Sequence, residues 1–282
     1  MKRIASIQDF SCLGKCSQTV ALPVLSAMGL ECAALPTALL SAHTAFDGFV
    51  SYDLTPQLSQ LTAHWRQLEL QFDAIYTGYL GAAEQIEAML RFFDVFPAPL
   101  HFVDPVMGDH GRLYAGFDDG FPKQLRRLCS RADVLTPNVT EACLLTETEY
   151  RALHSQDYLR TLLKELLALG AKNAVVTGIR LDERTTGVAA MQQDGALWLH
   201  TTEYLPSVFH GAGDLFAAVA VGALTLGQSL TEALTLAAEH TALTLRVTLA
   251  DPDRRWYGVN FESTLPELMR RLSRPTQTED EI

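Results

Sequence analysis

Short, largely apolar runs alternate with longer segments of helical spacing along most of this chain. The short runs predict strands at 3–7, 31–35, 74–77, 100–103, 132–135 and 174–177. Between them, apolar residues three and four positions apart predict helices at 19–28, 58–71, 84–93, from 140 onward and 156–169. Apolar strands separated by helices are typical of a mainly parallel sheet that is covered on both faces.

The pattern changes in the last third of the chain. Two strand-like runs, 186–192 and 196–202, flank an Asp194-Gly195 pair, which is a strong hairpin signal. Helices at 213–226, 230–247 and 263–272 follow. We therefore predict an α/β fold of three layers, with a mainly parallel central sheet and a late antiparallel hairpin. Residues 1–272 are expected to form one domain, and the polar residues 273–282 a disordered tail.

Composition and charge narrow the range of functions. The chain has 282 residues, 48% of them hydrophobic, which is enough for a large core. Its net charge of −11, without a basic patch, disfavours nucleic acid and anionic membrane surfaces as partners. No apolar run reaches the length of a membrane span. Five scattered cysteines indicate reduced thiols, so we expect a cytoplasmic protein.

The most informative motif is Gly211-Ala212-Gly213-Asp214, which leads directly into an Ala-rich helix. Two glycines one residue apart let the backbone turn tightly and approach a ligand. Free N–H groups at a helix start favour phosphate, and Asp214 can accept the proton of a hydroxyl group. This combination indicates phosphoryl transfer to an alcohol, although a plain loop capped by Asp is the alternative. A helix N-terminus also lowers the pKa of a carboxyl group, so Asp214 is expected to act through position more than basicity.

Polar clusters follow the predicted strands, at the sheet edge where α/β proteins bind ligands. The clusters are Gln8-Asp9, Ser41–Thr44, Thr77–Gly81, Asp104–Asp109, Thr136–Glu141 and Thr177-Gly178. Asp104 and Asp109 share one loop, where carboxylates suit Mg²⁺ or a monovalent cation, or simply stabilise a turn. Asn138 and Glu141 stand at a helix start, where a cap and an acid are also common for structural reasons.

A second group of residues indicates the kind of substrate. Asp9, His43, Thr44 and Tyr79 supply an acid, an imidazole, a hydroxyl and an aromatic face. This mixture suits a small, polar aromatic ring better than a sugar or a lipid.

Together these motifs resemble the ribokinase-like superfamily, and within it the vitamin B6 kinases, over about residues 1–250. Four motifs occur in the order of that family: Gly78–Gly81, Asp104–Asp109, Thr136–Glu141 and Gly211–Asp214. The resemblance implies a ribokinase-like sandwich, a homodimer, and ATP-dependent phosphorylation of the 5′-hydroxymethyl group of pyridoxal, pyridoxamine or pyridoxine.

The resemblance also implies roles for single residues. Asp214 would be the general base, and the backbone of Gly211, Ala212 and Gly213 would form the anion hole with it. Asp109 and Glu141 would serve Mg²⁺, and Asp104 would lie near K⁺ or the γ-phosphate. The nucleotide would be bound by Asn138, Thr177 and Gly178 together with Gly211 and Gly213. The vitamer ring would contact Asp9, His43, Thr44 and Tyr79.

Asp9 departs from the family pattern, because many pyridoxal kinases carry Ser at this position. A carboxylate there could pair with a protonated ring nitrogen or with the 4′-amine of pyridoxamine, and it could equally disfavour the aldehyde form. Two other functions stay open: a hydroxymethylpyrimidine kinase with the same fold and base, and a non-catalytic pyridoxal phosphate carrier or sensor. Because a mere binder needs no base at an anion hole, Asp214 together with Asp109 and Glu141 favours an enzyme.

Overall fold

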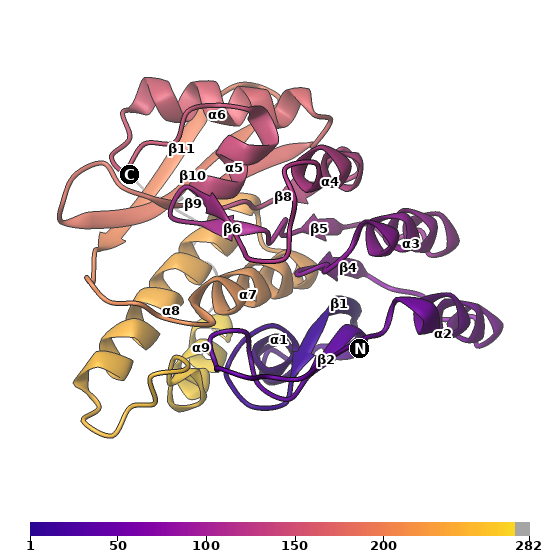
Figure 1. Cartoon of the computed structure of the whole chain (residues 1–282). Helices are drawn as coiled ribbons and strands as arrows, with labels where there is room; N and C mark the ends of the chain where they lie inside the picture. Colours follow the sequence, from indigo (N-terminus) through magenta and orange to yellow (C-terminus); the bar gives the residue numbers. More distant parts are fainter. Residues whose placement is uncertain (274–282) are drawn as a thin grey trace.

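A central sheet organises the computed structural model, which describes residues 1–273 (Figure 1). Nine strands of the described residues form this sheet, in the order β11-β10-β9-β8-β5-β4-β1-β2-β3. The strands are β1 (Arg3–Ser11), β2 (Glu31–Leu40), β3 (Ser51–Asp53), β4 (Ala74–Thr77), β5 (His101–Val103), β8 (Val134–Leu135), β9 (Asn173–Ile179), β10 (Thr185–Gln192) and β11 (Leu197–Glu203). In this sheet order, the neighbouring strands from β9 through β8, β5, β4 and β1 to β2 pair in parallel. Strands β3, β10 and β11 add antiparallel edges.

Helices cover both faces of this sheet (Figure 1). They are α1 (Gln18–Ala27), α2 (Thr55–Gln67), α3 (Ala83–Val95), α4 (Phe121–Cys129), α5 (Val139–Thr146), α6 (Gln156–Ala168), α7 (Ala212–Leu226), α8 (Leu230–Ala250) and α9 (Leu265–Leu272), with a short 3₁₀ helix η1 (Phe261–Ser263). No helix within residues 1–273 is long and apolar enough to cross a membrane.

Two apolar cores result from the alternation of side chains along the strands. In β1, Ala5 and Ile7 enter the core that α2 to α6 cover, whereas Ile4 enters the core under α1, α7, α8 and α9. The prediction of an α/β fold in three layers, with a parallel centre and a late hairpin, is therefore confirmed. Of the tail that we expected to be disordered, residues 274–282 lie outside the described residues.

Several element boundaries correct the sequence-based expectations. Strand β1 continues to Ser11, because its pairing with β2 resumes after a register shift between Gln8 and Phe10. Asp9 therefore lies at a bulge inside a strand and not in the loop after it. Thr177 and Gly178 likewise belong to β9. Helix α4, edge strand β3 and the short hairpin β6 (Gly108–Asp109) with β7 (Arg112–Leu113) were missing from the prediction.

Candidate active site

The Gly211–Asp214 turn begins helix α7 with a backbone that only glycine fits. Gly211 has a φ of 80°, and a Cβ atom there would lie 1.9 Å from the carbonyl oxygen of Lys15. The first bond of the helix runs from the N–H of Leu215 to the carbonyl of Gly211 at 3.0 Å. Within residues 1–273, no side chain caps this helix start. The N–H groups of Ala212 and Gly213 are thus left for an anion.

Asp214 has a higher pKa than a helix start alone would give it. Burial raises the pKa from 3.8 to about 6, although N–H groups of Ser17 and of Asp214 itself lower it. The negative charge of Asp9 raises the pKa further. Our expectation of a lowered pKa was wrong, because desolvation outweighs the helix dipole here. The carboxylate is still mostly ionised at neutral pH and is a better base than an ordinary Asp.

Asp104 lies close enough to Asp214 to interact with it electrostatically, and Glu141 interacts in turn with Asp104. Burial, followed by the charges of Glu141 and Asp214, raises the pKa of Asp104 well above its usual range. Burial also raises the pKa of Glu141 to about 8, even though backbone N–H groups donate to it. A cation bound among these oxygen atoms would restore the ionised forms. The donors are the hard oxygen ligands that Mg²⁺ and K⁺ prefer.

Glu141 and Asn138 also have a structural task at the start of α5. Their side chains and backbone N–H groups form a capping box, with donor–acceptor distances of 2.8 and 2.9 Å. The second oxygen of Glu141 accepts the N–H of Met107 at 3.1 Å. The Asn138 amide donates to the carbonyl of Gly108 at 2.8 Å. Both residues therefore tie α5 to the loop that follows β5, as the structural interpretation of the sequence allowed.

Asp109 is exposed on β6, beside a tight turn in which His110 and Gly111 have positive φ angles. One of its carboxylate oxygens accepts the N–H of His110 at 2.7 Å. Within the described residues, no three His, Cys, Asp or Glu side chains are grouped to hold a metal ion. Magnesium would therefore need phosphate oxygens and water in addition to Asp109 and Glu141.

The predicted nucleotide residues lie next to open space. Thr177 donates its backbone N–H to the carbonyl of Pro137 at 2.9 Å, which joins β9 to the start of α5. Gly178 has a φ of 70°, and apart from its chain neighbours no atom of residues 1–273 lies within 4 Å of the position that its Cβ would occupy. The space at the Cβ position of Gly213 is open in the same way. Both glycines thus leave room for a ligand that approaches the backbone closely.

On the other side of Asp214 the structure brings three of the four predicted ring-binding residues together. Asp9 is buried, and the Ser11 hydroxyl donates to it at 3.0 Å. Burial raises the pKa of Asp9, while Ser17, Ser11 and the nearby His43 lower it. Burial and the Asp9 charge raise the pKa of half-buried Tyr79. Thr44 is exposed beside this group.

His43 uses both ring nitrogens for the backbone. The N–H of Ala45 donates to Nδ1 at 3.1 Å, so Nε2 carries the proton and donates to the carbonyl of Tyr257 at 3.0 Å. Only 5% of His43 is exposed, so a ligand can reach only a small part of the ring and not its nitrogens. The ring centroid of His210 lies 4.8 Å away.

The comparisons with known proteins agree with this geometry. The chain matches the phosphomethylpyrimidine kinase family over residues 22–253. It belongs to that family. The chain is also 32% identical over 262 residues to a pyridoxal kinase of Rubrobacter xylanophilus, a match that covers 87% of both chains.

Two solved structures are similar to this member of the phosphomethylpyrimidine kinase family over nearly the whole chain. A pyridoxal kinase from Lactobacillus plantarum has a TM-score of 0.89 and 34% identity, with 96% of this chain and 98% of the other covered. A candidate phosphomethylpyrimidine kinase from Bacteroides thetaiotaomicron, crystallised with pyridoxal, has a TM-score of 0.89 and 39% identity, with 98% and 97% covered. The expected ribokinase-like fold and the similarity to vitamin B6 kinases are confirmed. The chain is a kinase with an alcohol group as acceptor, and its kinase relatives support ATP as the donor.

Ser17 is a site residue of this kinase that the sequence did not reveal. It has φ 49° and ψ −127°, a conformation that side-chain-bearing residues rarely adopt. Its backbone N–H lowers the pKa of Asp214 and its hydroxyl lowers the pKa of Asp9, so Ser17 lies near both acids. The adjacent Cys16 thiol is half-buried, and its pKa is raised by burial and by the charges of Asp214 and Asp9. That thiol is therefore neutral and is a poor nucleophile.

Proposed function

We propose that this protein transfers the γ-phosphoryl group of ATP to the 5′-hydroxymethyl group of a B6 vitamer. The observation that carries the proposal is the placement of Asp214. Its carboxylate lies at the uncapped start of α7, with Asp104 close by and Asp9 and Tyr79 toward the ring-binding side. A hydroxyl group held against this carboxylate would face a helix terminus that attracts phosphate.

In this proposal the residues of the turn have two separate tasks. Asp214 accepts the proton of the attacking hydroxyl, and its pKa of about 6 suits that exchange. The N–H groups of Gly211, Ala212 and Gly213 stabilise the negative charge of the transferring phosphoryl group. Thr177 and Gly178 line the nucleotide phosphates, and Asn138 shapes this side by holding the loop at Gly108.

We further propose that Mg²⁺ lies near Asp109 and Glu141, partly through water, and K⁺ near Asp104. When bound, these cations would neutralise phosphate charge. The raised pKa values of Asp104 and Glu141 support a cation requirement, because a positive charge would offset the repulsion among these acids. An isothermal titration of Mg²⁺ with the ATP analogue AMP-PNP tests this. Weaker Mg²⁺ binding in Asp109→Asn is expected, and unchanged binding would remove Asp109 from the site.

Ring recognition is assigned to Asp9, Tyr79 and the face of His43. The buried Asp9 carboxylate would pair with the protonated ring nitrogen or the 4′-amine, because a buried charge needs a partner. Thr44, exposed beside His43, would contact the ring or one of its substituents.

A hydroxymethylpyrimidine kinase is the second candidate, because the matching family carries the name of phosphomethylpyrimidine kinase. It would use the same base and anion hole. Steady-state kinetics with ATP, Mg²⁺ and K⁺ separate the two functions. We expect a higher kcat/KM for pyridoxal, pyridoxamine or pyridoxine than for hydroxymethylpyrimidine, and the opposite order would overturn the vitamer assignment. Saturable vitamer binding without turnover would favour a carrier or sensor.

We also propose a homodimer in the cytoplasm, built from single-domain subunits of residues 1–272. Strand β3 is an open antiparallel edge, and beside it Leu39, Val50 and Tyr52 are 39%, 52% and 64% exposed. An exposed apolar edge is the kind of surface that a second subunit covers. Light scattering after size exclusion tests this: Val50→Asp should yield monomers, and a monomeric wild type would contradict it. The five free cysteines fit a reducing compartment.

A further inference from the structure

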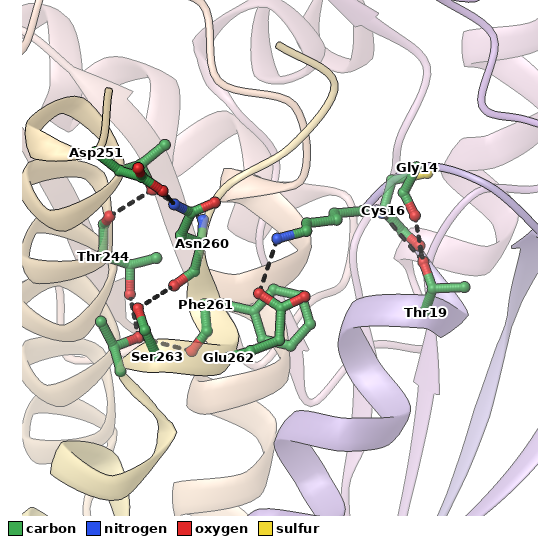
Figure 2. Close-up of polar contacts among 12 residues, drawn as sticks. Gly14, Cys16, Thr19, Thr244, Asp251, Asn260, Phe261, Glu262 and Ser263 are labelled. Atoms are coloured by element: carbon green, nitrogen blue, oxygen red, sulfur yellow. Dashed lines mark hydrogen bonds and ion pairs between the residues drawn. The ribbon is translucent and has the colours of Figure 1, made fainter. Parts of the chain in front are cut away.

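The segment 251–260, for which the sequence indicated no role, forms a strap that returns from α8 to the site. Its two ends are joined, since the Asn260 amide donates to the Asp251 carboxylate at 2.7 Å (Figure 2). The N–H of Asn260 also donates to the Thr248 hydroxyl at 2.8 Å. A loop with tied ends projects its middle residues as a defined unit.

A second anchor fixes the strap against the loop that carries Lys15. The ammonium group of Lys15 pairs with Glu262 at 2.8 Å and lies 5.7 Å from the ring centroid of Phe261 (Figure 2). A Cβ atom on Gly258 would lie 2.4 Å from the Lys15 Cβ, so the backbone at Gly258 packs closely against the Lys15 side chain. The Lys15 carbonyl lies against Gly211. Lys15 therefore contacts both the strap and the catalytic turn.

The middle of the strap carries two aromatic residues to the ring-binding side. The carbonyl of Tyr257 accepts a hydrogen bond from His43 Nε2, which lies 214 positions earlier in the chain. The Trp256 ring centroid lies 4.6 Å from that of Phe46, 5.9 Å from His43 and 6.2 Å from His210. His210 directly precedes Gly211, so this aromatic group adjoins the anion hole.

Trp256 keeps much of its surface free in this position. Its side chain is 58% exposed, whereas Trp65 and Trp198 are partly buried against the two cores. A large aromatic ring held in place at a site edge, but left uncovered, can contact a flat ligand at little conformational cost. Packing alone does not account for so exposed a Trp.

We propose that Trp256 forms the outer wall of the vitamer site and packs against the bound pyridine ring, together with His43 and His210. This inference rests on the proposed function and extends the substrate-binding residues to the C-terminal strap. The ligand class is a planar, polar heteroaromatic ring. Asn260 acts only by holding the strap, so it is a positioning residue.

Fluorescence tests the contact without any catalytic step. In the double variant Trp65→Phe/Trp198→Phe, Trp256 is the remaining tryptophan of the three in the chain. Titration with each vitamer in the absence of ATP should quench its emission saturably. Free N-acetyltryptophanamide, titrated in parallel, corrects for absorption by the vitamer. Binding detected by calorimetry without saturable quenching would overturn the proposal.

Kinetics supply a second test with matched variants. Trp256→Ala should raise the vitamer KM about 2- to 13-fold, the range expected for loss of an aromatic contact, with the ATP KM within about twofold. Trp256→Phe should restore most of the affinity, and Asn260→Ala should raise the vitamer KM in the same direction. A vitamer KM unchanged in Trp256→Ala would refute the proposed contact of Trp256 with the ring, but not the proposed function. Absence of vitamer turnover in the wild type would instead refute the proposed function.

Discussion

Replacing Asp214 with Asn should make the protein more stable and much less active. Burial raises the pKa of this carboxyl group from 3.8 to about 6, so the folded protein holds the proton more tightly than the unfolded chain. Ionising Asp214 therefore costs folding free energy at pH values above its folded pKa, and below the unfolded pKa this cost disappears. The Asn side chain keeps the shape and avoids the charge.

The size of this effect depends on pH in a defined way. A pKa shift from 3.8 to about 6 corresponds to about 3 kcal/mol at pH 7.5 and about 1 kcal/mol at pH 4.5. Asp214→Asn should gain up to these amounts in free energy of unfolding. Its kcat should fall by about 10²- to 10⁴-fold, the usual contribution of a general base.

Urea unfolding at the two pH values and steady-state kinetics measure both effects. Asp119→Asn is the control, because Asp119 is exposed and its replacement should change neither quantity. An Asp214→Asn protein that is less stable than the wild type at pH 7.5 would refute the argument from burial. Unchanged turnover would remove Asp214 from the mechanism.

Three further predictions concern Asp214 and the residues around it. The kcat profile should lose activity below about pH 6, and Asp9→Asn should move this limb to lower pH, because the Asp9 charge raises the pKa of Asp214; an unmoved limb in a pH–rate series would contradict the coupling. Gly211→Ala should abolish folding or activity, since its Cβ would collide with a backbone carbonyl, whereas Gly213→Ala should fold normally, by circular dichroism, and lose turnover only; equal stability of the two variants would argue against this. Ser17→Gly should raise the free energy of unfolding by roughly 1 kcal/mol by relieving strain, and Ser17→Ala should not; thermal unfolding of the pair decides this, and a gain only in Ser17→Ala would contradict it.

Periodicity predicted the architecture because most strands are buried on both faces and most helices have an apolar side. It failed where pairing continued past an irregularity, as at the Gln8–Phe10 register shift in β1. The β6–β7 hairpin was missed because its turn uses His110 and Gly111 in place of the usual Asn-Gly or Asp-Gly. Helix α4 was missed although Phe121, Leu125 and Leu128 have helical spacing and are buried.

Some residues of the candidate site could likewise be predicted from the sequence, and others could not. Local motifs identified the turn at Asp214 and the acids after β5, because each of these lies within a few residues of a strand or helix end. The direction in which the pKa of Asp214 shifts could not be predicted from the local sequence. It depends on burial and on Ser17, which lies some 200 positions away. Trp256 and Tyr257 reach the site only because the chain returns after α8.

The central claim is that this chain phosphorylates the 5′-hydroxymethyl group of a B6 vitamer with Asp214 as base. Mass spectrometry and ³¹P NMR of a single-turnover reaction test it most directly, with wild type and Asp214→Asn incubated with ATP, Mg²⁺, K⁺ and an equimolar mixture of pyridoxal, pyridoxamine, pyridoxine and hydroxymethylpyrimidine. We predict 5′-phosphorylated vitamer in the wild-type reaction and almost none in the variant. Phosphate only on the pyrimidine, or equal product from both proteins, would contradict the account.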